Sequence, residues 1–374
     1  MKNVRLLAVI TTVCVVIAAS SRLYKVFGQS NQTVEHDWNA TYTGQNLNHP
    51  SGLFKMPAAN GGIAADWLFI ADTGNNQIKL FQPGVGLQVL AGSGTKGNAD
   101  GSPQSAQFFN PTGLGGPGYI TRTDPSHNGE YSSAVRLSVF DTGNNVLKTV
   151  CVPMLVDGQA PICTSGGSVT TSSPGTTLSS PAMGTNAYVA NTGQHTLVAF
   201  DPSGNGTVLA GTSGTPGYTD GPLAQAQFAG PTKVVSGLSG NMLVADAGNF
   251  VIRQVSNGSV STLAGSGQRG YQDGPAGQAM FELPLSVAYN SSDGATYVAD
   301  TMNYCIRKID SSGNVTTYAG SHTVGNQDGT LTQALFASPV DLIIDSGIMY
   351  ISDSGNNSIR EINMSTGQVT TLIK

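Results

Sequence analysis

Short apolar runs that flank polar turns recur along this chain at wide intervals. The stretch IADTGNNQIKLF, residues 70–81, places an apolar run, a six-residue polar turn and a second apolar run with one lysine within twelve residues. Five further stretches repeat it: VFDTGNNVLKTV from Val139, VANTGQHTLVAF from Val189, VADAGNFVIRQV from Val244, VADTMNYCIRKI from Val298 and ISDSGNNSIREI from Ile351. Apolar runs around turns rich in Gly and Asn predict β-hairpins, and six copies predict a repeat architecture.

Each hairpin is predicted to belong to a sheet of four short strands. In the fourth repeat the strands are expected over residues 232–236, 241–246, 251–255 and 259–264. The second and fourth strands are apolar with little alternation, which is typical of sheets covered on both faces. One such sheet cannot hide both faces alone, whereas six sheets stacked around an axis can. The pattern therefore predicts an all-β fold, a six-bladed β-propeller of four-stranded antiparallel blades.

The repeats share a start and a connector. In five of them an apolar or aromatic residue precedes a proline by three positions; in the third only Pro174 remains, with Thr171 in the place of the aromatic residue. Four connectors carry an Asp-Gly pair and then a phenylalanine, which we expect to return to the core. Their aspartates are Asp100, Asp220, Asp273 and Asp328. The second repeat lacks this connector, so its link to the third is predicted to be irregular.

Composition and charge narrow the range of partners. The 374 residues include 48 glycines, and only 10% are charged, against roughly 25% in an average domain. This combination suits short strands joined by tight turns. From residue 31 onward there are 13 basic and 22 acidic residues, a balance of −9, and no basic cluster. An acidic chain of this kind argues against a nucleic-acid partner.

The N-terminus has the features of a targeting segment. Lys2 and Arg5 precede an apolar stretch, residues 6–19, that ends in small residues. The stretch is shorter than the ~20 residues that span a bilayer, so residues 1–20 are predicted to be a cleaved signal peptide, with a short membrane anchor as the alternative. Within the N-terminal segment, residues 21–46, the stretch WNATYTGQN (38–46) resembles NVTTYAGSH from Asn314, so this segment is a candidate closure strand. GQVTTLIK at the C-terminus also resembles an outer strand and is the other candidate. The propeller is assigned to residues 47–374.

Secretion would change the chemistry expected of cysteine and asparagine. Cys151 and Cys163 flank two apolar runs around an Asp-Gly turn, and an oxidising compartment would favour a disulfide between them. Cys305 is then left as a free thiol. Eight sequons would be glycosylation sites if the source is a eukaryote: Asn31, Asn39, Asn205, Asn257, Asn290, Asn314, Asn356 and Asn363.

Five repeats place an acidic residue seven positions before a basic one. The two positions fall on one face of a hairpin as diagonal neighbours, so we predict internal ion pairs. The third repeat has Asn191 and Val198 there, and both charges are absent together, as partners would be. The predicted pairs are Asp72 with Lys79, Asp141 with Lys148, Asp246 with Arg253, Asp300 with Arg307, and Asp353 with Arg360.

The motifs ADTGNNxI[RK], LAG at the end of a repeat and FxxP at its start resemble the NHL repeat, over residues 47–374. The resemblance implies a six-bladed propeller, a fold that supports many unrelated functions. Propeller enzymes of lactonase-like or amidating-lyase-like type resemble this architecture and hold a metal in the central channel. Here none of the four glutamates recurs at a matching position, and the five histidines are scattered. His195 and His322 are interpreted as solvated loop residues rather than metal ligands.

The sequence therefore favours a secreted or extracytoplasmic, non-catalytic binding or assembly scaffold for a protein or glycan partner. A metal-dependent propeller enzyme of lactonase-like or amidating-lyase-like type is the alternative. No cofactor is predicted, although the Asp-Gly connectors leave calcium open, and a membrane partner follows only if the N-terminal segment is retained. Two insertions, residues 55–66 and 115–135, are the candidate binding loops, since loops on a rigid scaffold carry function.

Overall fold

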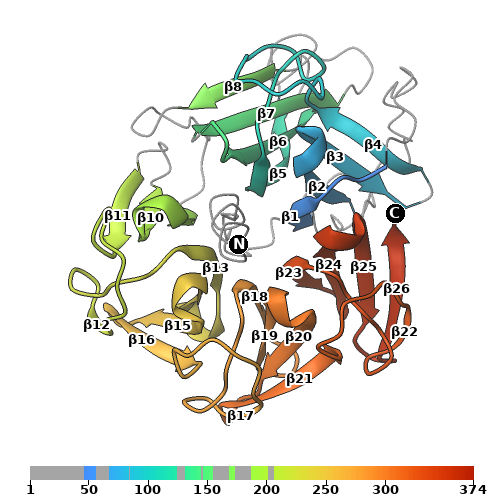
Figure 1. Cartoon of the computed structure of the whole chain (residues 1–374). Helices are drawn as coiled ribbons and strands as arrows, with labels where there is room; N and C mark the ends of the chain where they lie inside the picture. The colour runs from blue at the N-terminus through green and yellow to red at the C-terminus, as the bar shows by residue number, and fades with distance from the viewer. Residues whose placement is uncertain are drawn as a thin grey trace, which may run out of the picture.

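Six antiparallel sheets stand around one axis in a ring, so the predicted six-bladed β-propeller is confirmed (Figure 1). The computed structural model describes residues 46–55, 67–83, 85–123, 131–144, 146–154, 168–172, 187–200 and 206–374. The predicted signal peptide lies outside these residues, and so does the N-terminal candidate closure strand except for Asn46. No helix in the described ranges is long and apolar enough to cross a membrane.

The first three blades differ in strand length. Blade 1 consists of β1 (Pro50–Lys55), β2 (Leu68–Asp72), β3 (Gln77–Gln82) and β4 (Gly86–Ala91). Blade 2 consists of β5 (Pro111–Thr123), β6 (Tyr131–Asp141), β7 (Val146–Met154) and β8 (Ser168–Ser172). The described part of blade 3 consists of β9 (Ala187–Asn191), β10 (Thr196–Phe200) and β11 (Gly206–Ala210).

The last three blades are alike, and each has a two-residue fifth strand. Blade 4 contains β13 (Pro231–Ser236), β14 (Met242–Asp246), β15 (Val251–Ser256), β16 (Ser259–Ala264) and β12 (Gly221–Pro222). Blade 5 contains β18 (Pro284–Asn290), β19 (Ala295–Asp300), β20 (Cys305–Ile309), β21 (Asn314–Gly320) and β17 (Gly274–Pro275). Blade 6 contains β23 (Pro339–Asp345), β24 (Ile348–Asp353), β25 (Ser358–Asn363), β26 (Gln368–Ile373) and β22 (Gly329–Thr330).

Short 3-10 turns join the second and third strands of five blades. The residue that follows each of these turns has a left-handed backbone conformation. Asn tolerates this conformation and occupies the position in blades 1 and 6, as Asn76 and Asn357. The turns are η1 (Thr73–Asn75), η2 (Thr192–Gln194), η4 (Ala247–Asn249), η5 (Thr301–Asn303) and η6 (Ser354–Asn356). A further 3-10 turn, η3 (Leu238–Gly240), joins β13 to β14.

The fifth strands come from the connectors, and they show which blade Thr171 belongs to. Each connector crosses to the outer edge of the next blade, as β12 does when it pairs with β16. In blade 2 the corresponding bridge joins Gly101 to Val169 of β8. Thr171 therefore lies in the outer strand of blade 2, and its assignment to the start of the third repeat was wrong. Its backbone N–H donates to Asp100 Oδ2 at 2.8 Å.

The hydrophobic core lies between neighbouring blades rather than inside any one sheet. Separate clusters of buried side chains join blades 1 and 2, 3 and 4, 4 and 5, and 5 and 6. The connector phenylalanines are buried in these clusters, as the repeat pattern predicts, and they are Phe108, Phe228, Phe281 and Phe336. Each blade consequently depends on its neighbours to keep its apolar faces from water.

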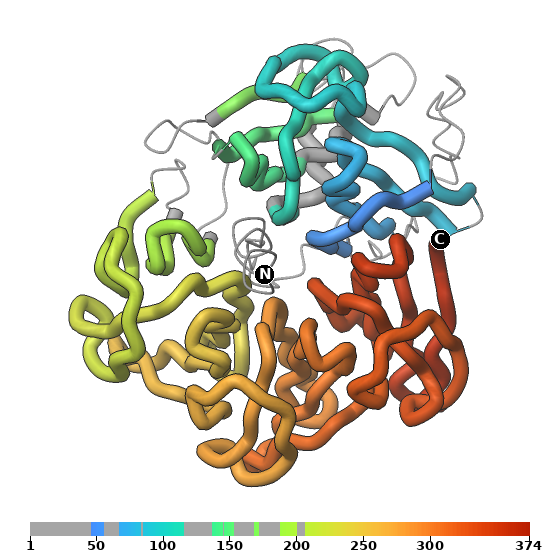
Figure 2. The backbone as a smooth tube through the Cα atoms, viewed as in Figure 1, coloured from blue at the N-terminus to red at the C-terminus, as the bar shows by residue number. Residues whose placement is uncertain are grey.

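The ring closes by packing of its first blade against its last. The chain passes once around the ring and brings β26 beside blade 1 (Figure 2). Leu53 and Ile70 of blade 1 form a buried cluster with Ile359 and Ile373 of blade 6. Each described blade is built from strands that follow one another in sequence. Among these residues, apolar packing, hydrogen bonds such as Leu53 N–H to Asp341, and the Lys55–Asp345 ion pair join the first blade to the last.

Candidate functional site

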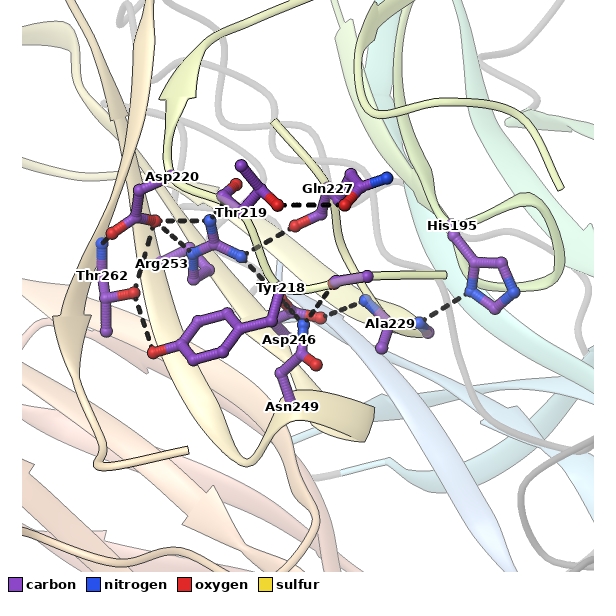
Figure 3. Close-up of polar contacts among 12 residues, drawn as sticks. His195, Tyr218, Thr219, Asp220, Gln227, Ala229, Asp246, Asn249, Arg253 and Thr262 are labelled. Atoms are coloured by element: carbon purple, nitrogen blue, oxygen red, sulfur yellow. Dashed lines mark hydrogen bonds and ion pairs between the residues drawn. The ribbon is translucent and has the colours of Figure 1, made fainter. Parts of the chain in front are cut away.

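The repeated aspartate organises a buried polar cluster beneath the turn of each complete blade. In blade 4, Asp246 Oδ1 accepts a hydrogen bond from the backbone N–H of Ala229 at 2.8 Å (Figure 3). Its Oδ2 accepts from Asn249 Nδ2 at 2.8 Å and from Arg253 Nη1 at 2.9 Å. The aspartate therefore fixes the loop that enters the blade, its own turn and the facing strand.

The arginine of this cluster also contacts the connector that enters its blade. Arg253 Nε donates to Asp220 Oδ1 at 3.1 Å, and its Nη2 donates to the carbonyl of Thr219 at 2.9 Å. Nη1 donates to the carbonyl of Gln227 at 3.0 Å (Figure 3). A fully buried guanidinium thus lies between two aspartates from different segments. Its planar set of donors suits such a position.

Blades 5 and 6 repeat this arrangement. Arg307 contacts Asp300 at 2.8 Å and the connector aspartate Asp273 at 2.6 Å. In blade 6, Arg360 contacts Asp353 at 3.2 Å and Asp328 at 2.7 Å. We name this recurring group, a base between a hairpin aspartate and a connector aspartate, the acid–base cluster.

The structure brings together four of the five hairpin pairs directly. In blade 1, Lys79 Nζ lies 2.6 Å from Asp72. In blade 2, Lys148 forms its ion pair with Asp100 at 2.9 Å instead of with Asp141. Asp141 accepts from Asn144 and from the backbone of Phe109. The ammonium of lysine is a compact single group, whereas the planar guanidinium of arginine presents donors on several nitrogens and can contact both carboxylates.

The pKa values of the hairpin aspartate Asp141 and the connector aspartate Asp100 of blade 2 are shifted in opposite directions. Desolvation raises the pKa of Asp141 to about 6, against the opposing effects of Asn144, Phe109 and Lys148. Asp100 is also desolvated, but hydrogen bonds from Lys148 and Thr171 together with the charge of Lys148 leave its pKa lowered. The hairpin carboxylate is therefore held in its charged form at a cost, while the half-exposed connector carboxylate favours ionisation.

This difference predicts a pH dependence of stability for Asp141→Asn. The folded-state pKa of about 6 lies above 3.8, the ordinary pKa of an aspartate in an unfolded chain. The favourable contribution of Asp141 is therefore fully present below the unfolded pKa and is lost as the pH rises through 6. Urea unfolding should show the stability of wild type relative to the variant falling by on the order of 2 kcal/mol between pH 4 and pH 7. A relative stability that rises over this range would contradict the assignment.

A second buried ion pair crosses the centre of the ring. Lys233 Nζ of β13 lies 2.6 Å from Asp341 Oδ1 of β23, and Ser286 Oγ of β18 donates to the same oxygen at 2.6 Å. The other oxygen, Oδ2, accepts from the backbone N–H of Leu53 in blade 1 at 2.8 Å. All three polar side chains are buried. This central cluster links blades 1, 4, 5 and 6.

The central cluster does not follow from the repeated motifs of the sequence. Its three polar residues each stand two positions after the first proline of a blade, where blades 1 and 2 have Gly52 and Gly113. At Gly52 an added Cβ would lie 2.1 Å from the carbonyl oxygen of Thr112, so this position is close to a neighbouring blade. Aligning the repeats shows Gly at this position in blades 1 and 2 but Lys, Ser and Asp in blades 4, 5 and 6, and this change could have indicated the cluster.

Both clusters satisfy their charges internally, which limits the chemistry they can perform. Each buried aspartate accepts hydrogen bonds from several protein donors, and each buried base contacts an acid. Among the residues that the structure describes, no group of three or more His, Cys, Asp or Glu side chains could hold a metal ion. The connector aspartates that suggested calcium contact buried bases in blades 2, 4, 5 and 6.

The remaining predicted site residues are cysteines, histidines and the asparagines of the sequons. Cys305 is free and buried, and Cys151 lies buried in β7, but Cys163 lies outside the described residues, so their disulfide stays a prediction. His195 Nδ1 accepts from the backbone N–H of Gly230 at 2.9 Å (Figure 3), so it joins blades instead of being free in solvent. His322 stacks on Tyr271, with 4.5 Å between ring centroids.

The sequons differ in their availability. Asn31, Asn39 and Asn205 lie outside the described residues. Asn257 and Asn314 are exposed at the hairpins between the third and fourth strands of blades 4 and 5, whereas Asn290 and Asn363 are partly buried at strand ends. Asn356 Nδ2 donates to Asp353 at 2.6 Å and to the carbonyl of Gly325 at 2.8 Å. A glycan would leave this amide one N–H for two bonds, so Asn356 is not expected to be modified in the folded protein.

Comparisons with known proteins agree with the repeat pattern. The chain is 27% identical over 361 residues to NHL repeat-containing protein 2 of Homo sapiens, which covers 86% of this chain and 48% of that protein. It is 27% identical over 325 residues to Protein SUPPRESSOR OF QUENCHING 1, chloroplastic, of Arabidopsis thaliana, which covers 80% of this chain and 29% of that protein. The chain thus spans half or less of these relatives. No protein-family model matches it.

Solved structures with a similar fold are more distant. Virginiamycin B lyase from Staphylococcus aureus matches with a TM-score of 0.48 at 11% identity, over 89% of this chain and 86% of the lyase. Propellers this distant differ widely in activity, so the match carries no functional conclusion. The relatives named NHL repeat-containing protein 2 and the six-bladed ring support the NHL-repeat family that the repeats resemble.

Proposed function

We propose that this protein is a secreted, non-catalytic scaffold that binds a protein or glycan partner. The observation that carries the proposal is the disposition of its charges. The hairpin aspartates and the bases that face them are buried in ion pairs that hold the blades together. These groups have little hydrogen-bonding capacity left for a substrate. A binding role then falls to surfaces that the propeller geometry does not require.

One such surface extends from blade 2. β5 and β6 stay paired from Pro111 opposite Asp141 to Thr123 opposite Tyr131, and β7 continues beside β6 as far as Met154. β5 has 13 residues, whereas the inner strands β1 and β13 have six each. The insertion interpreted as a binding loop is therefore largely a β-ribbon. We use the name β-ribbon for the segment 116–135, of which residues 124–130 lie outside the described part of the chain.

Replacing the β-ribbon should separate binding from folding. A variant in which residues 116–135 give way to the short β13–β14 turn, Gly237–Asn241, keeps residues 111–115 of β5 and 136–141 of β6, about the length of the corresponding strands in the other blades. We expect it to fold with a urea midpoint close to that of the intact chain and to lose partners captured from extracellular material. Cross-linking mass spectrometry of both proteins measures this. Capture of the same partners by the variant would contradict the role of the β-ribbon.

The proposed function requires that the protein be secreted. The basic start and apolar stretch of residues 1–20 support export, and an oxidising compartment would allow Cys151 and Cys163 to pair. Expression of the full chain in a secreting eukaryotic cell tests both features. The proposal expects mature protein in the medium that begins after residue 20 and carries glycans on Asn257 or Asn314. Retention of an intact N-terminus inside the cell would count against it.

The alternative, a metal-dependent propeller enzyme, has a direct assay. A lactone panel supplemented with divalent cations should show no turnover by the purified chain. Turnover that depends on an added cation would reverse the order of the two proposals.

A further inference from the structure

Two connectors carry a tyrosine at the same place on the rim of the ring. Tyr218 and Tyr271 each stand two residues before the connector aspartate, and their side chains are 46% and 40% exposed. The Tyr218 hydroxyl is 3.1 Å from Thr262 Oγ1 in the outer strand of blade 4 (Figure 3). Arg253 lies over the ring, 5.2 Å from its centroid. The ring is thus fixed in orientation while much of it meets solvent.

The fold does not require a tyrosine there. Blades 2 and 6 have Asn98 and Asn326 at the equivalent connector positions. Arg360 of blade 6 is nevertheless fully buried and contacts both of its aspartates. The aromatic ring therefore adds exposed surface that neither burial of the arginine nor the connector path needs.

The two tyrosines differ in what covers them. His322, in the connector that leaves blade 5, stacks on Tyr271 with 11° between the ring planes. The equivalent residue of blade 4 is Gly267, where an added Cβ would lie 3.0 Å from Tyr218 Cε1. Gly267 therefore carries no side chain over Tyr218, whereas in blade 5 an imidazole stacks on the equivalent tyrosine.

The neighbourhood of this position indicates a neutral ring that carries hydroxyl groups. The face of a tyrosine ring is electron-rich and attracts polarised C–H groups. Arg253 already occupies one position over the ring, which disfavours a second cation beside it. The side chain of Asp220 is 46% exposed, and its Oδ1 accepts from Arg253 and Thr262. Its Oδ2, which among the described residues accepts only from the backbone N–H of Thr262, can accept a further hydrogen bond from a ligand.

We propose that Tyr218, with Gly267 and Asp220, forms a carbohydrate subsite in which a neutral sugar ring stacks on the tyrosine and donates a hydroxyl to the carboxylate. This inference rests on the proposed binding function but concerns a surface separate from the β-ribbon. In blade 5, His322 fills the corresponding position, so Tyr271 does not bind sugar.

Variants copied from the neighbouring blades test the subsite, and urea unfolding of each variant checks that it still folds. Gly267→His places the blade 5 residue over Tyr218, at a backbone φ of 78° against 57° for His322. Tyr218→Asn copies blade 6. Each should weaken sugar binding at least about tenfold, a loss of about 1.4 kcal/mol. His322→Gly should open Tyr271 and raise the number of bound sugars from one to two per chain.

The probes are glucose, galactose, mannose, N-acetylglucosamine and their β-linked disaccharides, titrated into the full chain and followed by NMR or calorimetry. Saturation by at least one sugar, lost in Gly267→His, supports the subsite. No saturation by any sugar, or binding unchanged in Gly267→His, overturns it, and so does binding only to a cationic peptide. Replacing the β-ribbon should leave sugar binding intact, so failure of the subsite and failure of the β-ribbon are distinguishable.

Discussion

Arg307→Ala should lower the free energy of unfolding by about 3–5 kcal/mol, because it leaves two aspartates beside an empty space where a guanidinium was buried. Arg307 contacts Asp300 at 2.8 Å and Asp273 at 2.6 Å, and it also donates to the carbonyls of Met280 and Gln272. The substitution therefore disconnects the hairpin, the connector and the adjoining loop together. Equilibrium unfolding in urea gives the loss directly.

Arg269→Ala is the matched control for this experiment. Arg269 belongs to the same connector as Asp273 and pairs with Glu282, but its side chain is 50% exposed. Because solvent screens such a pair, its removal should cost less than about 1 kcal/mol. If Arg307→Ala cost no more than Arg269→Ala, the acid–base cluster would not be the main polar link between connector and blade.

Asp341→Asn is expected to have an effect of similar size at the centre of the ring. It leaves the buried ammonium of Lys233 without a counter-charge and weakens the bonds from Ser286 and Leu53, so we expect a loss of about 3–5 kcal/mol. The double variant Lys233→Met with Asp341→Asn should recover part of this loss, since no unpaired charge is then buried. Urea unfolding of the two single variants and the double variant measures the coupling.

Lys308→Met provides the comparison for the central pair. Lys308 lies 2.9 Å from Asp293, but both side chains are partly exposed. Its removal should cost less than about 1 kcal/mol, as for surface pairs in general. Additive effects of Lys233→Met and Asp341→Asn, with no coupling between them, would show that the central cluster is not an energetic unit.

The sequence predicted the ring because its signal is repeated and local. Each turn that follows Asp72 or a counterpart has the same residues, and each strand has the same apolar character, so six copies identify the blade without reference to contacts between distant residues. The buried phenylalanines of the connectors follow from the same spacing. The irregular blade 3 shows the limit, because Thr171 lacks such neighbours and was assigned to the wrong blade.

The partners of each base were harder to predict because they come from a different segment. A spacing of seven residues indicates Asp300 and Arg307, but nothing local links Arg307 to Asp273, which lies 34 positions earlier. Lys148 shows the consequence, since its ion pair is with Asp100 and not with Asp141. The pair of Lys233 and Asp341 spans 108 positions and crosses from blade 4 to blade 6. Only the assembled ring brings these groups together.

Metal analysis of the purified full chain tests most directly whether the buried acids serve the architecture. After gel filtration without chelator, inductively coupled plasma mass spectrometry should find no divalent metal in stoichiometric amount, because the buried carboxylates are paired with Lys and Arg. One tightly bound metal per chain that supports turnover of a lactone would contradict the account and favour the enzyme alternative.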